Sequence, residues 1–191
     1  MGFINDYLPP YQKTVNLVLA SIMTALVCVT TFFFQIPIPA TGGYFNVGEA
    51  VIYISAILFG PIIGGIAGGV GAALADTMSG PYIIYAPGTL VIKFCEGFII
   101  GFIIYRAHLK KWEGWKEYVI IITAVIIGGL FMVLGYFVYE AYILGLGVPY
   151  AAWEIPFNLT QLGIGAAVAI PVSIGIQKAY PIKESPKEEI G

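Results

Sequence analysis

The chain has 191 residues, of which 59% are hydrophobic and 10% charged, and its formal net charge is −2. A soluble domain carries about 25% charged residues, so this sequence has too few polar groups to cover a water-exposed surface. Disordered chains are excluded as well, because they are poor in hydrophobic residues. The composition therefore predicts a membrane protein. We expect an all-α fold, since a membrane β-barrel would alternate polar and apolar residues along each strand.

The first predicted span runs from Val15 to Phe34, which is 20 residues without a charge. A helix of this length crosses a hydrocarbon core of about 30 Å. It exceeds the apolar core of about 7–15 residues in a signal peptide, so we interpret it as an uncleaved span. The residues that follow, 37–48, are rich in turn formers, which predicts a structured loop outside the membrane.

A second uncharged stretch, from Ala50 to Leu74, is interrupted by Gly60 and Pro61. Pro61 fits the first turn of a new helix, whereas inside one helix it would remove a hydrogen bond and clash with the preceding turn. The stretch is therefore either one kinked helix or two short helices, and a turn over 76–82 follows it.

Three more spans are predicted, at 83–105, 119–139 and 155–176. With six spans in total, eight basic residues lie on one side of the membrane and none on the other, whereas five spans give seven against one. Since basic residues accumulate on the cytoplasmic side, this distribution favours six. We predict one six-helix domain over 1–178, with short second and third spans and both termini cytoplasmic. Residues 179–191 are predicted to form a soft cytoplasmic tail.

Lys93 lies about ten residues into its span, hence roughly 15 Å deep and near the bilayer centre. A charge at that depth costs about 2.5–3.5 kcal/mol on insertion scales, so it needs a partner inside the protein. Glu96 follows three residues later and lies on the same helical face. The two residues form either an ion pair that joins helices or the polar floor of a ligand site.

Further polar and aromatic residues are predicted near the external face: Asn46, Glu49, Asp76, Tyr82, Tyr85, Glu140, Trp153, Glu154, Asn158 and Gln161. Aromatic residues at this depth often form an interfacial belt instead of a ligand site. Asn158 and Gln161 differ, because they share a helical face inside the last span, where buried amides need partners. Either a ligand or a neighbouring helix can supply those partners.

Small residues recur at four-residue spacing in two predicted spans: Gly64, Gly68 and Ala72, then Gly65, Gly69 and Ala73, and then Gly97 and Gly101. Such faces let helix backbones approach closely, so helix packing is their simplest role. In the first span, four residues form a similar patch in the cytoplasmic half, namely Ala20, Ser21, Thr24 and Ala25. This patch can receive another subunit.

The sequence contains no motif that is typical of a metal-binding or cofactor-binding site. Cys28, Cys95 and His108 lack the spacing of metal ligands, and neither a Walker loop nor a dinucleotide fingerprint is present. We therefore predict no cofactor, no metal site, no catalytic site and no nucleic-acid partner. Because the chain cannot hydrolyse a nucleotide in the usual way, any energy that it uses has to come from a partner or from a gradient.

The stretch from Pro37 to Gly97 contains a recognisable series: Pro37-x-Pro39, Gly43-Tyr-Phe-Asn46-Val-Gly-Glu49, Leu58-Phe-Gly-Pro61, Gly68-Gly-Val-Gly-Ala, Ala75-Asp76 and Lys93-x-x-Glu96-Gly97. It resembles the substrate-binding S components of energy-coupling factor (ECF) vitamin transporters, especially the group named for riboflavin that also includes hydroxymethylpyrimidine and pyridoxine carriers. The resemblance is dense over residues 14–105 and weaker over the last two spans.

The resemblance implies a six-helix bundle whose ligand site opens to the outside, with the first loop as its lid. It implies that a transmembrane coupling subunit and two cytoplasmic ATPases drive uptake of a vitamin. The coupling motif of the family, Ala-x-x-x-Ala, is present here only approximately, as Ala20-x-x-x-Thr24 and Ser21-x-x-x-Ala25. Riboflavin is the first expected ligand, followed by pyridoxine and hydroxymethylpyrimidine.

We expect the lid and the interior polar side chains to bind the substrate. The residues expected in the site are Tyr44, Asn46, Glu49, Tyr85, Lys93, Glu96, Glu140, Asn158 and Gln161. A self-contained carrier or channel is the alternative, with Lys93, Glu96 and Glu140 as an ion relay, although we find no inverted repeat. A membrane enzyme is disfavoured, because no nucleophile and base are paired.

Overall fold

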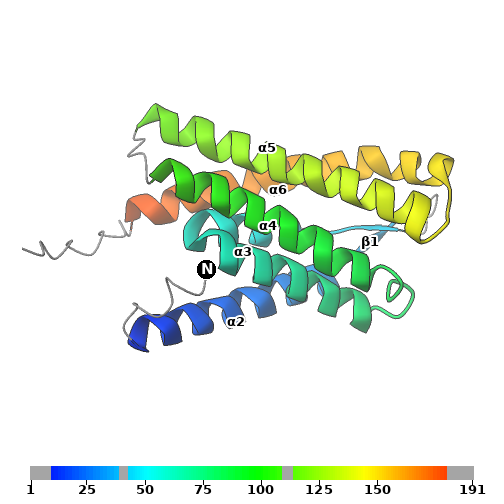
Figure 1. Cartoon of the computed structure of the whole chain (residues 1–191), viewed down its shortest axis with the longest axis horizontal. Coiled ribbons are helices and arrows are strands. Elements are labelled where there is room, and N and C mark those ends of the chain that lie inside the picture. Colours follow the sequence, from blue (N-terminus) through cyan, green and yellow to red (C-terminus); the bar gives the residue numbers. More distant parts are fainter. Residues whose placement is uncertain (1–9, 39–42, 109–113, 180–191) are drawn as a thin grey trace, which may run out of the picture.

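The structure is a computed structural model that describes residues 10–38, 43–108 and 114–179, the side chains of 10–12 excepted. Its long helices are α2 (Pro10–Phe33), α3 (Gly48–Met78), α4 (Ala86–His108), α5 (Trp115–Val138) and α6 (Val148–Ala179). A π-helical turn, η1 (Tyr139–Ile143), continues α5, and two short strands, β1 (Ile36–Pro37) and β2 (Tyr44–Phe45), follow α2. The helices lie side by side in one elongated bundle (Figure 1). The predicted all-helical class is confirmed.

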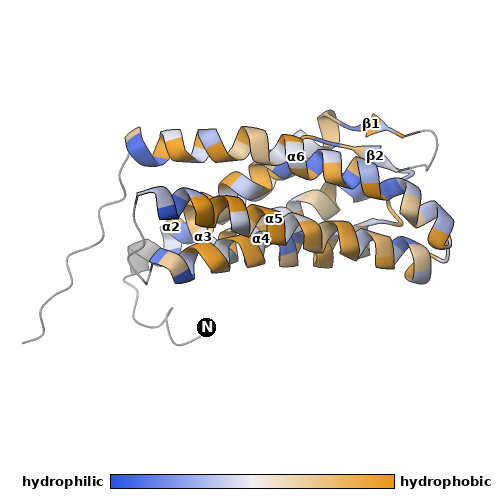
Figure 2. Ribbon diagram, turned by 90° about the horizontal axis from the view of Figure 1, so that it is seen from above, coloured by the Kyte–Doolittle hydropathy of each residue, from blue (hydrophilic) through white to orange (hydrophobic). Residues whose placement is uncertain are grey.

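The helices have the length and the apolar surface of membrane spans. Five segments qualify among the described residues: Lys13–Phe33, Gly48–Met78, Ala86–His108, Trp115–Ile143 and Val148–Ala179. Hydrophobic residues predominate along them (Figure 2), and many are exposed, such as Leu17 at 69% and Leu134 at 61%. Large apolar side chains face outward, whereas the charged side chains away from the start of α2 and the end of α6 are buried, namely Glu49, Asp76, Lys93, Glu96, Glu140 and Glu154. The exterior between the helix ends therefore suits lipid. The described residues form five membrane-length helices, so the structure does not confirm the six predicted spans.

α3 does not run straight through the bundle. Gly60 has φ +83° and ψ −171°, which interrupts the helix, and Pro61 begins the second arm. The arms then run antiparallel, since a Cβ on Gly68 would lie 3.0 Å from Ile52 Cγ2. In one straight helix, residues 52 and 68 would be about 24 Å apart. The first arm, 48–59, covers only about 18 Å, which is less than the hydrocarbon core.

Both ends of α3 therefore lie at the same end of the bundle. Gln35 Nε2, just before β1, donates a hydrogen bond of 2.8 Å to Ser79 Oγ, just after α3. We name this end, which holds the strands, residues 79–85 and η1, the loop end. The opposite end, where α2 begins and α6 ends, is the terminal end (Figure 1). Most of the predicted tail lies outside the described residues, as does Gly42 of the predicted lid.

Glycines bring α3 and α4 into close contact. A Cβ on Gly101 would lie 2.5 Å from Pro61 N, and one on Gly69 would lie 2.6 Å from Leu90 O. Around this contact, Val27, Tyr53 and Ile100 are buried in a core that all the long helices share. The glycine spacing in the sequence thus marks helix packing, as predicted.

The last span begins earlier than predicted. α6 starts at Val148 and not near Ile155, because Pro149 fits the first turn of a helix. The additional turns carry Glu154 into the bundle, where it is 4% exposed.

Candidate functional site

A polar cavity of about 40 Å³ lies at the loop end of the bundle. It is lined by Gly43, Tyr44, Asn46, Asp76, Tyr85, Thr89, Tyr136, Glu140, Glu154, Asn158 and Gln161. These residues come from the segment around β2, the loop 79–85, η1 and the four helices α3 to α6. The volume holds a few water molecules, and it is smaller than the roughly 300 Å³ of a typical ligand pocket. A molecule the size of a typical ligand therefore fits only when one of the covering elements moves.

The β1–β2 hairpin covers this cavity and takes the place of the predicted lid. Its strands pair antiparallel, with Pro37 opposite Tyr44. The Tyr44 hydroxyl donates a hydrogen bond to Asp76 Oδ1, and the Tyr44 ring lies 4.5 Å from the Tyr82 ring between centroids. Burial and the Asp76 carboxylate raise the pKa of Tyr44 above its ordinary value, so the hydroxyl stays protonated as a donor. The hairpin is thereby held against the end of α3.

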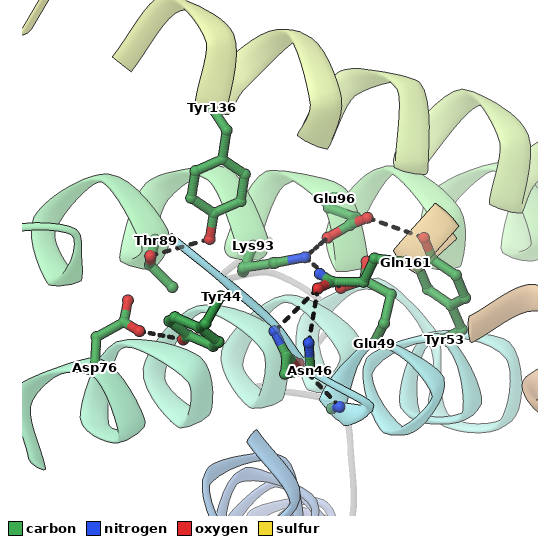
Figure 3. A network of polar contacts seen from close by, with 11 residues as sticks. Tyr44, Asn46, Glu49, Tyr53, Asp76, Thr89, Lys93, Glu96, Tyr136 and Gln161 are labelled. Atoms are coloured by element: carbon green, nitrogen blue, oxygen red, sulfur yellow. Dashed lines mark hydrogen bonds and ion pairs between the residues drawn. The ribbon is translucent and has the colours of Figure 1, made fainter. Parts of the chain in front are cut away.

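Beneath the cavity, a charged network joins α3 and α4 (Figure 3). Lys93 Nζ forms ion pairs with Glu49 and with Glu96 Oε2, the second at 3.0 Å. Tyr53 OH donates to Glu96 Oε1 at 3.1 Å. Lys93 is 2%, Glu49 1% and Glu96 0% exposed, so all three charges are inside the bundle. The structure brings Lys93 and Glu96 together as their spacing predicts, and it adds Glu49 from another helix.

Gln161 connects this network to the lid. Its Nε2 donates to Glu49 Oε2 at 2.9 Å, and its Oε1 accepts from the backbone N of Asn46 at 3.1 Å and from Asn46 Nδ2 at 3.2 Å. Asn46 Oδ1 in turn accepts from the N–H of Gly48, where α3 begins. One continuous set of hydrogen bonds therefore links the end of the hairpin with α3, α4 and α6.

The far wall of the cavity carries two buried carboxylates. Glu140 lies in η1 and is 3% exposed, and Glu154 of α6 is 4% exposed. A Cβ on Gly43 would lie 3.0 Å from Glu154 Cδ, so the hairpin packs directly on this carboxylate. Near them, Tyr85 OH lies 3.4 Å from Tyr150 OH. π-helical turns such as η1 are frequent at functional sites.

The predicted site residues fall into two layers. Six of them line the cavity: Tyr44, Asn46, Tyr85, Glu140, Asn158 and Gln161. The other three, Glu49, Lys93 and Glu96, form the charged network below it. Their role in binding a substrate stays a prediction.

Two lining residues were missed by the sequence analysis. Thr89 and Tyr136 approach each other at 3.0 Å between hydroxyl oxygens. Each lies four residues before a charged residue that the sequence analysis did name, Lys93 and Glu140 respectively. This i, i+4 spacing puts them on the same helical face and is the signal that would have found them. Asp76 and Glu154 were noted as polar positions but not assigned to the site.

The small-residue patch on α2 divides between two faces. Ala20 is 9% exposed and belongs to the core, and a Cβ on Gly71 would lie 2.7 Å from Thr24 O. Ser21 and Ala25 are exposed. Only the second pair is therefore available to another subunit, because Ala20 and Thr24 face the bundle.

Known proteins resemble this chain in sequence. The profile of the family described as "ECF-type riboflavin transporter, S component" matches residues 11–178. A protein of Pyrococcus woesei, described as an "uncharacterized protein in gap 3'region", is 47% identical over 118 residues, which is 62% of this chain and 72% of that protein.

Two solved structures share the fold. One is reported as the S component of a bacterial ECF transporter and has a TM-score of 0.64 and 21% identity. The match covers 87% of this chain and 98% of the bacterial component. The other is an S component for biotin from an ECF-type ABC transporter, with a TM-score of 0.66 and 16% identity. That match covers 90% of this chain and 94% of the biotin component. The matched sequence extends through all five long helices. The chain therefore belongs to the family of S components of ECF-type riboflavin transporters.

Proposed function

We propose that this chain captures a vitamin or vitamin precursor on the outside of the cell membrane. A coupling subunit in the membrane and two cytoplasmic ATPases then drive uptake. Family membership supports this role, since the family comprises substrate-binding components of transporters and not enzymes. The observation that carries the proposal is the polar cavity, which lies inside an apolar bundle and is covered by the β1–β2 hairpin.

In this proposal the loop end faces outward and both termini are cytoplasmic. The four basic residues Lys13, Arg106, Lys116 and Lys178 lie in the first or last turns of helices at the terminal end. Basic residues concentrate on the cytoplasmic side of membrane proteins. The two arms of α3 then count as the short second and third of six segments.

Riboflavin is the first ligand to test, because the family description names it. Pyridoxine and hydroxymethylpyrimidine come next. The coupling subunit is proposed to contact α2 at the surface around Ser21 and Ala25, which is exposed.

Binding and energy coupling can be tested separately. We expect the purified chain to bind its vitamin without an ion gradient, and to co-purify with ATPase subunits when a coupling module is co-expressed. Uptake into liposomes that contain the chain alone, driven by a proton or sodium gradient, would contradict the proposal and support a self-contained carrier.

A further inference from the structure

Acidic side chains outnumber basic ones inside the bundle. Among the described residues that are buried, five are acidic and one is basic: Glu49, Asp76, Glu96, Glu140, Glu154 and Lys93. The ion pairs of Lys93 are with Glu49 and Glu96. Neither Asp76 nor Glu140 forms an ion pair with any residue that the structure describes. The cavity walls therefore carry more acidic groups than basic ones, and in a low-dielectric surrounding such groups are neutralised either by a proton or by a bound cation.

Two carboxylate oxygens at the cavity have unused hydrogen-bonding capacity. Asp76 is 1% and Glu140 3% exposed, and both line the cavity. Within residues 10–38, 43–108 and 114–179, Asp76 Oδ2 and Glu140 Oε2 are buried without a hydrogen-bond partner. A buried acceptor that lacks a donor is costly, so a donor supplied by a ligand would be strongly favoured. These oxygens need N–H or O–H groups and do not match a ligand rich in carbonyls.

Aromatic rings surround the same space. Tyr44, Tyr85 and Tyr136 all line the cavity. Burial, the hydrogen bond to Tyr150 and the negative charges of Glu140 and Glu154 together raise the pKa of Tyr85, so its ring and hydroxyl stay neutral. Neutral tyrosine rings attract cations through their faces. The aromatic lining and the carboxylates thus favour the same kind of ligand.

We infer that the cavity binds a nitrogen-ring compound that carries a positive charge and N–H donors, such as a pyridine with a protonated aminomethyl group or an aminopyrimidine that is protonated when bound. This inference rests on the proposed function and names the ligand class for that site. It departs from riboflavin, which is uncharged. Asp76 has a double role in this arrangement: Oδ1 accepts from Tyr44 of the hairpin, and Oδ2 accepts from the ligand, so one carboxylate joins the ligand to its lid.

Matched probes test the charge requirement. Pyridoxamine and pyridoxine share one ring and differ in an aminomethyl and a hydroxymethyl group; 4-amino-5-hydroxymethyl-2-methylpyrimidine and its 4-oxo analogue form a second pair. Affinities are measured by equilibrium dialysis with the full chain in lipid nanodiscs, with riboflavin as a neutral comparator. We expect the amino member of at least one pair to bind about tenfold more tightly than its neutral partner.

Single substitutions test whether Glu140 and Asp76 cause the preference for the amino compound. Glu140→Gln and, independently, Asp76→Asn replace a carboxyl group by an amide of nearly the same shape that cannot become negatively charged, and each is expected to reduce the preference to less than about threefold. Glu117→Gln makes the same change at the terminal end, where Glu117 contacts His108, and is expected to keep the preference. Small molecules released from the chain purified from its native membrane are identified by mass spectrometry, and the ionisable groups of the identified compound give its charge at neutral pH.

The outcomes separate the inference from the proposed function. Tighter binding of riboflavin or of the neutral partners, or a released ligand without a positive charge, overturns the inference and leaves vitamin capture intact. The inference is also overturned when Glu140→Gln and Asp76→Asn both keep the full preference. A chain that binds none of the probes and releases no small molecule overturns the proposed function as well.

Discussion

Gln161 of α6 and Glu49 of α3 are joined by a hydrogen bond of 2.9 Å between Nε2 and Oε2, deep inside the bundle. Because Gln161 also accepts two hydrogen bonds from Asn46, it is the point at which the lid and the charged network meet. Asn46 is 8%, Gln161 4% and Glu49 1% exposed, so water cannot replace these contacts easily. The position of the hairpin is therefore coupled to the ion pairs of Lys93 below it.

Replacing Gln161 by leucine tests this connection. The change leaves the backbone N–H of Asn46 without a partner and removes one of two donors to Glu49 Oε2, the other being Lys93 Nζ. We expect a loss of about 2–3 kcal/mol in stability together with weaker ligand binding. Thermal unfolding and equilibrium dialysis in nanodiscs measure both quantities. Thr160→Ala is the control, because Thr160 is exposed on the same helix and bonds only to Pro156 O. Equal effects of the two variants would refute the connection.

Removing Lys93 tests the ion network. Lys93→Met leaves Glu49 and Glu96 buried with no cation between them, and we expect it to destabilise the bundle by about 3–5 kcal/mol. Adding Glu49→Gln to Lys93→Met is expected to recover part of that loss, since it removes one of the two buried negative charges. A double-mutant cycle of unfolding free energies gives the coupling. Additive effects would show that the Lys93–Glu49 pair contributes no interaction of its own.

Tyr44→Phe tests how the lid is held. The variant keeps the ring beside Tyr82 but loses the hydroxyl that donates to Asp76. Hydrogen bonds to charged groups contribute about 1.5–3 kcal/mol, so ligand dissociation is expected to accelerate by about tenfold or more. Stopped-flow measurements with the ligand that co-purifies provide the rate. Tyr142→Phe, at a tyrosine that is 68% exposed, should leave the rate unchanged; a normal rate in Tyr44→Phe would exclude the hydroxyl as the holding contact.

Ala25→Phe tests the proposed coupling surface on α2. Ala25 is exposed, and a bulky ring there would hold another helix away from a small-residue face. We expect ligand affinity to stay the same while co-purification with the coupling subunit and ATPases falls by about tenfold. Ala167→Phe places the same ring at an exposed alanine of α6 and should not affect assembly. Normal assembly of Ala25→Phe would show that the coupling subunit contacts another surface of the protein.

Gly101→Ala tests the packing of α4 against the break in α3. The added Cβ would lie 2.5 Å from Gly60 C and Pro61 N, which are backbone atoms that cannot turn away. We expect a loss of about 1–3 kcal/mol in stability. Gly163→Ala is the matched control, because a Cβ there meets nothing within 4 Å. Identical unfolding curves for Gly101→Ala and Gly163→Ala would show that α3 and α4 can move apart without a loss of stability.

Part of this architecture follows from the sequence through local rules. The scarcity of charge indicates a membrane protein, because a surface so poor in polar groups cannot face water. The spacing of Lys93 and Glu96 puts them on one helical face, and the structure pairs them at 3.0 Å. Such predictions succeed because the helical repeat alone determines which residues of one helix are neighbours.

Contacts between different secondary-structure elements are determined only by the tertiary structure. Glu49 reaches Lys93 from another helix 44 residues away, and Tyr44 reaches Asp76 across 32. At Gly60 the sequence allowed a kink or two helices, and the contact of Gly68 with Ile52 shows that the chain folds back. The physical reason is that the helical repeat orders residues around one axis, whereas the rotation and pairing of axes depend on how all faces pack at once.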